Sequence, residues 1–335
     1  AFATLGTNRS GNLGSSSSIN YRNKNFFRGA ERFEWKVYGG LEWQNTNTNL
    51  DNENSTVLGN TPINTYEFGT QLTLTIPDFL LRNPNKDLPR IKEPKTSIIL
   101  ALDRQGRPQF DRDLINTGIQ WSMRLRKQDQ LVVAPIDLSV INLRKTDAFT
   151  AQLQQTRNPL LISSYSDHII PAGRASYSYS TQNLSNPLLN FYYYKLNVET
   201  AGNLLRLSSP LLGLQQSDNS YLIDSIAYAQ YIKSDFEYKK YFVVNKSSSY
   251  IYRVFIGAGL PLANREALPF DRSFFAGGSN SIRAWRARAL GPGNVADTTT
   301  FGIDQVGELQ LEMNLEYRFD LIKQLEGALF VDMGN

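Results

Sequence analysis

The feature that most restricts the fold is a long run of strict alternation, ELQLEMNLEYRFDL, at residues 308–321. Leu, Glu, Met and Gln all favour helices. A helix would spread the apolar and polar residues around its circumference, whereas a strand places them on opposite faces. We therefore predict a strand with an apolar and a polar face. The apolar parity is Leu309, Leu311, Met313, Leu315, Tyr317, Phe319 and Leu321, and the polar parity is Glu308, Gln310, Glu312, Asn314, Glu316, Arg318 and Asp320.

Similar alternation recurs along the chain and predicts an all-β protein. We count about thirteen strands, the first at residues 1–7 and the last at 328–334, with polar connections such as 44–62 between them. No internal repeat or interdomain linker interrupts them, so residues 1–335 are expected to form one domain. Further alternating segments lie at 33–43, 72–76, 119–126, 194–199 and 250–260.

The length of the strands favours a membrane barrel. A strand of about 14 residues spans roughly 46 Å, whereas strands of globular proteins usually have about 3 to 10 residues. A tilted transmembrane strand needs about 9 to 11 residues. The 17 Tyr and 18 Phe, many near strand ends, suit interfacial girdles. We predict a transmembrane antiparallel β-barrel with its apolar parity outward. A soluble sandwich or lipocalin-like barrel, with the apolar parity inward, is the alternative.

Composition excludes several other classes. The 335 residues contain no run near the ~18 apolar residues of a transmembrane helix. Cysteine is absent and His168 is the one histidine, so disulfides, thiolate metal sites and His-based zinc clusters are excluded, and no cofactor is expected. The net charge of +4 comes from interspersed charges and does not indicate a nucleic-acid partner.

One Gly-rich segment, FFAGGSNSIRAWRARALGPGN at 274–294, stands apart from the strands around it. It lacks GxxxxGK[ST] and GxGxxG. It also joins strand to strand, so no helix N-terminus is available to bind phosphate. A nucleotide-binding role is therefore not indicated.

The segment resembles the sixth extracellular loop of the BamA/TamA outer-membrane assembly family in three places: FFAGG, SIRAW and LGPG. Its sequence looks closer to that of TamA-like members. Eleven predicted strands precede this segment, as that loop number requires. FVDMGN at 330–335 is similar to the family's motif on the thirteenth strand, and residues 6–35 resemble its opening hairpins. The matching loop residues are Gly277, Gly278, Ile282, Arg283, Ala284, Trp285, Gly291 and Pro292.

The resemblance implies that this loop folds into the barrel lumen and that its arginine pairs with two carboxylates. The matching residues are Arg283, Glu316 and Asp332, and parity places both carboxylates on the polar face. Ala284 departs from the family, which usually has Gly there. A requirement for positive φ at this position would make Ala cost about 1 kcal/mol or more.

The resemblance also implies a sixteen-strand barrel in the bacterial outer membrane. Three further strands would follow Asn335, and periplasmic domains would precede residue 1. Its clients would be outer-membrane proteins, inserted into the bilayer through a weak lateral seam by β-augmentation. A TamB-like periplasm-spanning protein is the expected partner. The seam strand would comprise Ala1, Phe2, Ala3, Thr4, Leu5, Gly6 and Thr7.

Three alternatives stay open. A passive porin would share the alternation, and a two-partner-secretion transporter of the same superfamily would share the loop. A barrel hydrolase would pair His168 with Ser163, Ser164 or Ser166, although the spacing around His168 does not indicate a catalytic triad.

Overall fold

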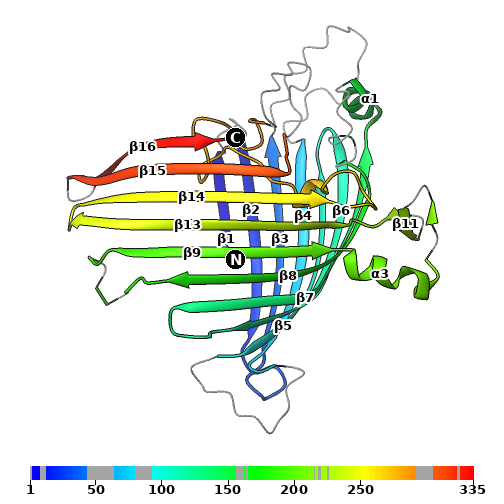
Figure 1. Ribbon diagram of the computed structural model, residues 1–335, viewed down its shortest axis with the longest axis horizontal. Coiled ribbons are helices and arrows are strands. Elements are labelled where there is room, and N and C mark those ends of the chain that lie inside the picture. The colour runs from blue at the N-terminus through cyan, green and yellow to red at the C-terminus, as the bar shows by residue number, and fades with distance from the viewer. Residues whose placement is uncertain are drawn as a thin grey trace.

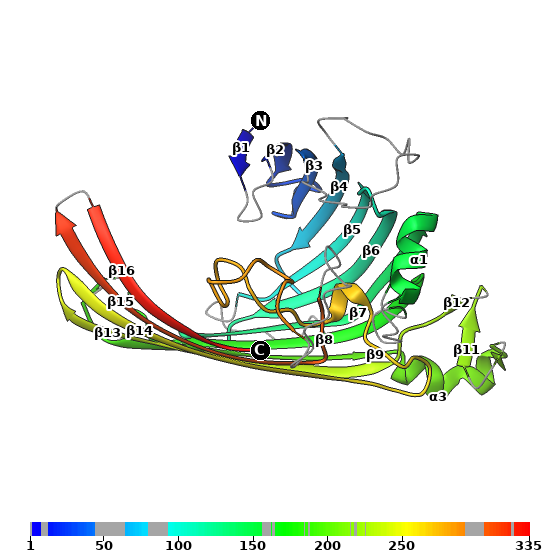
Figure 2. The same cartoon turned by 90° about the horizontal axis from the view of Figure 1, so that it is seen from above.

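The strands form one antiparallel sheet. The computed structural model describes residues 2–7, 13–43, 64–79, 93–155, 162, 165–183, 185–186, 188–214, 216–217, 220–224, 226–291, 305–322 and 325–335. Over this part of the chain the main sheet has thirteen strands, and each pairs with the strand next to it in the order β1 to β9, β13, β14, β15, β16. The sheet bends into a trough with β1 and β16 at its edges (Figures 1 and 2).

The strand bounds agree with the alternating segments in most places. They are β1 (Phe2–Thr7), β2 (Leu13–Asn23), β3 (Arg32–Trp43), β4 (Thr65–Ile76), β5 (Lys95–Gly106), β6 (Phe110–Met123), β7 (Asp129–Lys145), β8 (His168–Ser180), β9 (Phe191–Ala201), β13 (Tyr231–Asn245), β14 (Ser248–Pro261), β15 (Leu309–Ile322) and β16 (Leu325–Gly334).

One predicted strand end is wrong. The segment 119–126 was expected to continue through Leu125, but β6 ends at Met123 and residues 124–128 turn towards β7. The pairing of β6 with β7 also shifts between Ile119 and Trp121. The alternation of apolar and polar residues in 119–126 continues into the charged turn. It also gives no sign of the bulge in β7, which pairs with β6. Periodicity alone therefore could not detect either feature.

The smaller elements lie in connections at one end of the strands (Figure 1). Helix α1 (Asp147–Gln155) follows β7, and α3 (Asn203–Leu212) follows β9. A small sheet of β10 (Gln216–Ser217), β11 (Ser220–Ile223) and β12 (Ile226–Ala227) then leads to β13, and the short 3-10 helix η2 (Phe270–Arg272) follows β14. None of the helices in these described segments has the length and apolarity to cross a membrane.

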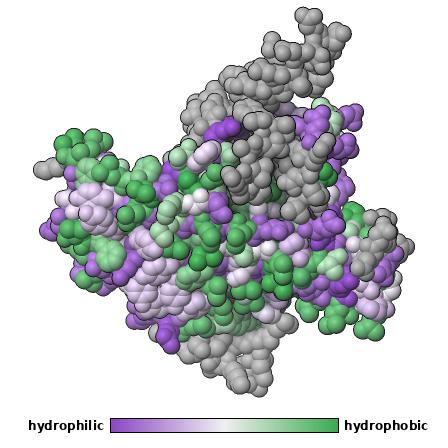
Figure 3. Space-filling model, turned by 45° about the horizontal axis from the view of Figure 1, so that its top comes forward, coloured by the Kyte–Doolittle hydropathy of each residue, from purple (hydrophilic) through white to green (hydrophobic). Residues whose placement is uncertain are grey.

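Burial along β15 is the reverse of that in a soluble protein. Leu309, Leu311, Met313 and Leu315 are exposed, whereas Glu312 retains only 3% exposure. The polar parity faces the concave side of the trough, where the β14–β15 connection covers it (Figure 2). Apolar side chains are spread over the opposite face of the sheet (Figure 3). A soluble sandwich would bury the apolar parity instead, so this burial favours apolar-outward packing.

Aromatic rings gather on the convex face, most of them towards the strand ends that lie away from α1 and α3. The rings of Tyr179 and Tyr194 stack at 5.3 Å, and those of Tyr250 and Tyr317 lie 4.7 Å apart. Aromatic girdles mark the membrane interfaces of outer-membrane barrels. The set, called the aromatic belt below, comprises Tyr177, Tyr179, Tyr192, Tyr194, Phe236, Tyr238, Phe242, Tyr250, Tyr317 and Phe319.

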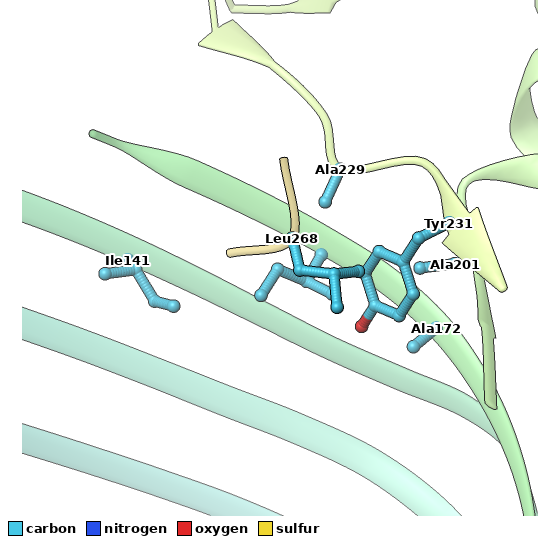
Figure 4. Packing of buried hydrophobic residues seen from close by; sticks show 7 residues of the cluster. Ile141, Ala172, Ala201, Ala229, Tyr231 and Leu268 are labelled. Carbon is cyan, nitrogen blue, oxygen red and sulfur yellow. The ribbon is translucent and has the colours of Figure 1, made fainter. Parts of the chain in front are cut away.

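Two buried clusters hold the start of the β14–β15 connection against the sheet. In the first, Leu268 packs against Tyr231 and neighbouring strand residues (Figure 4), and the members are Ile141, Ile170, Ala172, Ala201, Ala229, Tyr231 and Leu268. In the second, Phe270 of η2 joins α1, and the members are Phe110, Phe149, Leu153, Tyr165 and Phe270. The connection is therefore fixed before it crosses the concave face.

Candidate functional site

The candidate site is the β14–β15 connection and the strands beneath it. Two glycines of β14 make room for this connection. A Cβ at Gly257 would lie 2.5 Å from the Phe274 ring, and one at Gly259 would lie 2.4 Å from the Leu268 side chain. Contacts this short are not tolerated, so the IGAGL stretch lets two apolar side chains pack directly on the strand backbone.

Residues 274–291, called the central loop below, fold back on themselves. The Gly278 N–H donates to the Trp285 carbonyl at 2.9 Å, and the Gly277 N–H donates to the Ser281 Oγ at 3.0 Å. Gly277 has φ +94°, and a Cβ there would lie 2.2 Å from the Arg286 carbonyl oxygen. The glycine is therefore required both by backbone conformation and by close approach.

Arg283 reaches from the central loop to two adjacent strands. Its Nε and Nη2 donate to Asp332 of β16 at 2.8 and 2.7 Å, and its Nη1 donates to Glu316 of β15 at 2.6 Å. The backbone N–H of Arg283 donates to Asp332 as well, at 3.0 Å. These distances fit charge-assisted hydrogen bonds, and the bond with Asp332 is bidentate.

The surroundings of Arg283 strengthen the contact. The side chains of Arg283, Glu316 and Asp332 are 15%, 14% and 5% exposed, so water screens the charges weakly. The side-chain hydrogen bonds to Asp332, followed by the one to Glu316, raise the pKa of Arg283 above its usual range. The guanidinium also lies 3.6 Å from the centre of the Phe330 ring, within cation–π distance.

A second polar cluster lies beside the first, on β14 and β15. The Glu312 side chain is 1% exposed and accepts hydrogen bonds from the Ser281 hydroxyl and, at 2.8 Å, from Arg253. Asn314 donates to the Ser281 carbonyl at 3.0 Å and to Asp332 at 2.9 Å, and so links the two clusters. The buried carboxylate of Glu312 is thereby paired with a cation and with the loop.

The opposite end of the connection is also held by charge. Arg272 donates to Ser139 at 3.1 Å and to Asp137 at 3.4 Å, both on β7. Lys233 of β13 donates to the Arg272 carbonyl at 2.6 Å. The connection is thus tied to β7 and β13 at one end and to β15 and β16 at the other, across the concave face.

Sequence reasoning named most of the residues that meet here. Ile282 is buried and Trp285 is half exposed. Gly291 has positive φ, but Ala284 does not, so alanine carries no backbone strain at the position where the family usually has Gly. Pro292 lies outside the described residues. Of the predicted seam strand, Phe2–Thr7 forms β1 at an edge of the sheet, and Ala1 lies outside the described residues.

Sequence reasoning did not single out the second cluster. Glu312 and Asn314 share the polar parity with Glu316, so the pattern placed them on the correct face. The register that puts Asn314 opposite Asp332 would have identified Asn314 as its neighbour. The hydrogen bond between Ser281 and Glu312 depends on the path of the central loop. The alternation of residues along β15 does not predict that path.

The residues of the hydrolase alternative are engaged in other contacts or lie outside the described residues. Ser166 accepts a hydrogen bond from Arg265 at 2.7 Å. Arg265 is held at this position by the Asp167 and Ala227 carbonyls. Ser163 and Ser164 lie outside the described residues. The contacts of Ser166 are therefore those of a structural residue that fixes Arg265.

Comparison with known proteins gives one family over nearly the whole chain. The Omp85 superfamily domain matches residues 3–335. The fold is similar to that of BamA from Haemophilus ducreyi lacking POTRA domains 1–3, with a TM-score of 0.61 and 13% identity over 98% of this chain and 55% of that one. CdiB from Escherichia coli matches with a TM-score of 0.49 and 12% identity over 99% of this chain and 51% of that one. The chain spans about half the length of these structures.

Proposed function

The chain belongs to the Omp85 superfamily and lies in the bacterial outer membrane, and from this premise we propose that it is an assembly factor that inserts client β-barrel proteins into that membrane. The proposed unit is a C-terminal barrel domain, residues 1–335, completed by three further strands to sixteen. The exposed apolar parity of β15 and its buried polar parity support the placement of this unit as a membrane barrel.

In the proposed mechanism, β1 is the strand at which a client adds. Strand β1 pairs with β2 at one edge of the described sheet. Its partners on β2 include Ser15, Ser16, Ser17 and Ser18, and small polar side chains offer little apolar contact across a strand pair. Replacing the last strand of the barrel at β1 by a client strand would therefore cost little free energy. The backbone N–H and C=O groups of the client strand would be hydrogen-bonded to β1 before the client is released into lipid. The serine-rich pairing of β1 with β2 is the observation that carries this proposal.

The central loop would act as a brace inside the barrel. With Arg283 bound to β15 and β16 and Arg272 bound to β7, the loop would hold the barrel wall in shape while the seam opens. We propose this role for Arg283, Glu316 and Asp332 together with the glycines of the loop. A TamB-like partner stays a prediction of the sequence resemblance.

The central loop also separates this proposal from a porin. A loop tied to both sides of the concave face would obstruct a wide aqueous channel, and a porin needs such a channel. A two-partner-secretion transporter would share the loop and differ in its substrate, a single soluble protein moved across the membrane.

The proposal can be tested with the full-length protein in proteoliposomes and a urea-unfolded eight-stranded barrel as client. Client folding, followed by heat-modifiable migration on gels, is expected to be faster than in empty liposomes. The absence of Cys in the chain allows Thr4→Cys on β1 to be paired with single cysteines along the client's strands. Thr4→Cys is expected to form a disulfide with a client cysteine. Val37→Cys on β3, which lies between two paired strands, is the matched control and is expected to form none.

Each alternative predicts a different result. No acceleration, with steady ion conductance, would favour the porin. No acceleration, with export of a soluble passenger, would favour the transporter. Equal trapping at Thr4 and Val37 would overturn the role of β1 even if client folding is accelerated.

A further inference from the structure

Helix α3, in the connection between β9 and β13, presents an unusually exposed apolar face. Leu204, Leu207 and Leu211 are 79%, 80% and 91% exposed, and their i, i+3, i+7 spacing puts them on one stripe of the helix. Single exposed leucines are ordinary on protein surfaces, but three aligned residues at this exposure form a continuous patch. This face lacks a protein partner among the described residues, and its occupant has to be sought elsewhere.

The other face of α3 is fixed to the protein. Ser209 is fully buried and its hydroxyl is 3.3 Å from that of Tyr228. Arg206 lies over the Tyr221 ring at 5.2 Å and donates to Asn264 at 3.4 Å. These contacts set the rotation of the helix, so the leucines point away from β11, β12 and the β14–β15 connection. In Figures 1 and 2, α3 extends outward from the end of β9.

The leucine face continues the apolar surface of the sheet. Helix α3 begins directly after β9, and Asn203 ties its first turn to Thr200 at 2.7 Å and to the Tyr231 carbonyl at 3.1 Å. The nearby convex residues Ile232 and Leu260 are paired in register and are 47% and 61% exposed.

The distance between α3 and the far edge of the aromatic belt, measured along the barrel axis, is close to the height of the apolar band of an outer-membrane barrel. Phe242 is the belt residue of β13 farthest from α3 and lies ten residues from Ile232 beside α3, with Tyr238 and Phe236 of the belt between them. Ten residues at about 3.3 Å span roughly 33 Å, which at a strand tilt of about 40° rises about 25 Å. That is about the height of the apolar band of outer-membrane barrels. Helix α3 is therefore at the height of the second membrane–water interface when Phe242, at the outer edge of the belt, marks the first.

We propose that α3 is an interfacial helix that inserts Leu204, Leu207 and Leu211 into the acyl-chain boundary of the outer leaflet, with lipid as the occupant of this face. Amphipathic helices bind membranes in this way, with the apolar side a few ångströms below the headgroups. The helix would tie the β9–β13 connection, and through Arg206 and Asn264 the β14–β15 connection, to the bilayer surface.

The absence of Cys in the chain permits a direct test. Single variants Leu204→Cys, Leu207→Cys and Leu211→Cys of the full-length protein are labelled with an environment-sensitive NBD fluorophore. They are then reconstituted in phosphatidylcholine vesicles with or without dibrominated acyl chains. Leu311→Cys, on the convex face of β15, serves as the lipid-exposed control, and Lys246→Cys, in the β13–β14 turn, serves as the water-exposed control. Heat-modifiable migration confirms that each variant is folded.

Blue-shifted emission at all three leucine positions, quenched by brominated lipid to an extent near that of Leu311→Cys, is the expected result. Emission like that of Lys246→Cys would overturn the proposal because the face would then be in water. Blue-shifted emission that brominated lipid does not quench would also overturn it, because the face would then be covered by protein, either a second copy or another partner.

Discussion

Arg283 in the central loop and Asp332 on β16 are 49 residues apart in sequence and are joined by three hydrogen bonds, two from the guanidinium and one from the backbone N–H of Arg283. Glu316 on β15 accepts a single bond from the same guanidinium. The loop is thus bound to two neighbouring strands through one side chain. This arrangement makes the loop and the β15–β16 hairpin depend on each other for stability.

Removing the guanidinium is expected to destabilise the protein. Arg283→Ala would leave the weakly solvated Asp332 carboxylate without its cation, whereas Glu316 would keep Arg318. Loss of one partner of a buried pair costs about 3 to 5 kcal/mol. Urea unfolding in detergent micelles, monitored by heat-modifiable migration, would measure the loss. Arg286→Ala is the matched control, because it removes the same charge from an exposed side chain of the same loop. Equal midpoints for the two variants would contradict a bracing role for Arg283.

Asp332 is expected to contribute more to the contact than Glu316. Double-mutant cycles of Arg283→Ala with Asp332→Ala and with Glu316→Ala give the two coupling energies. Arg283→Ala keeps the bond from the backbone N–H, so the cycles compare two guanidinium bonds to Asp332 with one to Glu316. The coupling with Asp332 should therefore be larger, by about 1 kcal/mol. Glu316 also accepts a bond from Arg318, which would remain after Arg283 is lost. Equal couplings would indicate that charge alone, and not the bidentate geometry, holds the loop.

Much of this arrangement could be predicted from the sequence. Parity placed Glu316 and Asp332 on the polar face, because successive strand residues point to opposite sides. The resemblance of the loop suggested Arg283 as their partner. Neither source predicted the bulge in β7 or the role of Glu312, because the bulge depends on the register of the strands and the role of Glu312 on the path of the covering loop. The short helix α3 was also missed, although Gly202 and Gly213 border its leucine-rich segment.

Glu312 provides a test of the part that sequence analysis missed. Glu312→Gln keeps the size of the side chain but removes the charge that faces Arg253, so about 2 to 3 kcal/mol of stability should be lost. Glu326→Gln, at an exposed position of the adjacent β16, should stay within about 0.5 kcal/mol of the parent. The same urea titration measures both. A loss no greater for Glu312→Gln than for Glu326→Gln would mean that the buried cluster does not support the loop.

The two small residues on either side of Arg283 in the central loop are expected to respond in opposite ways. Gly277→Ala would introduce a Cβ 2.2 Å from the Arg286 carbonyl oxygen at a positive φ, so the loop must shift. About 2 kcal/mol or more is the expected cost, since left-handed strain alone costs about 1 to 2 kcal/mol. Ala284→Gly, which restores the residue usual in the family, should not stabilise the protein, because the backbone at Ala284 has no positive φ. A gain in stability from Ala284→Gly would show that the loop adopts a second conformation, in which this position needs glycine.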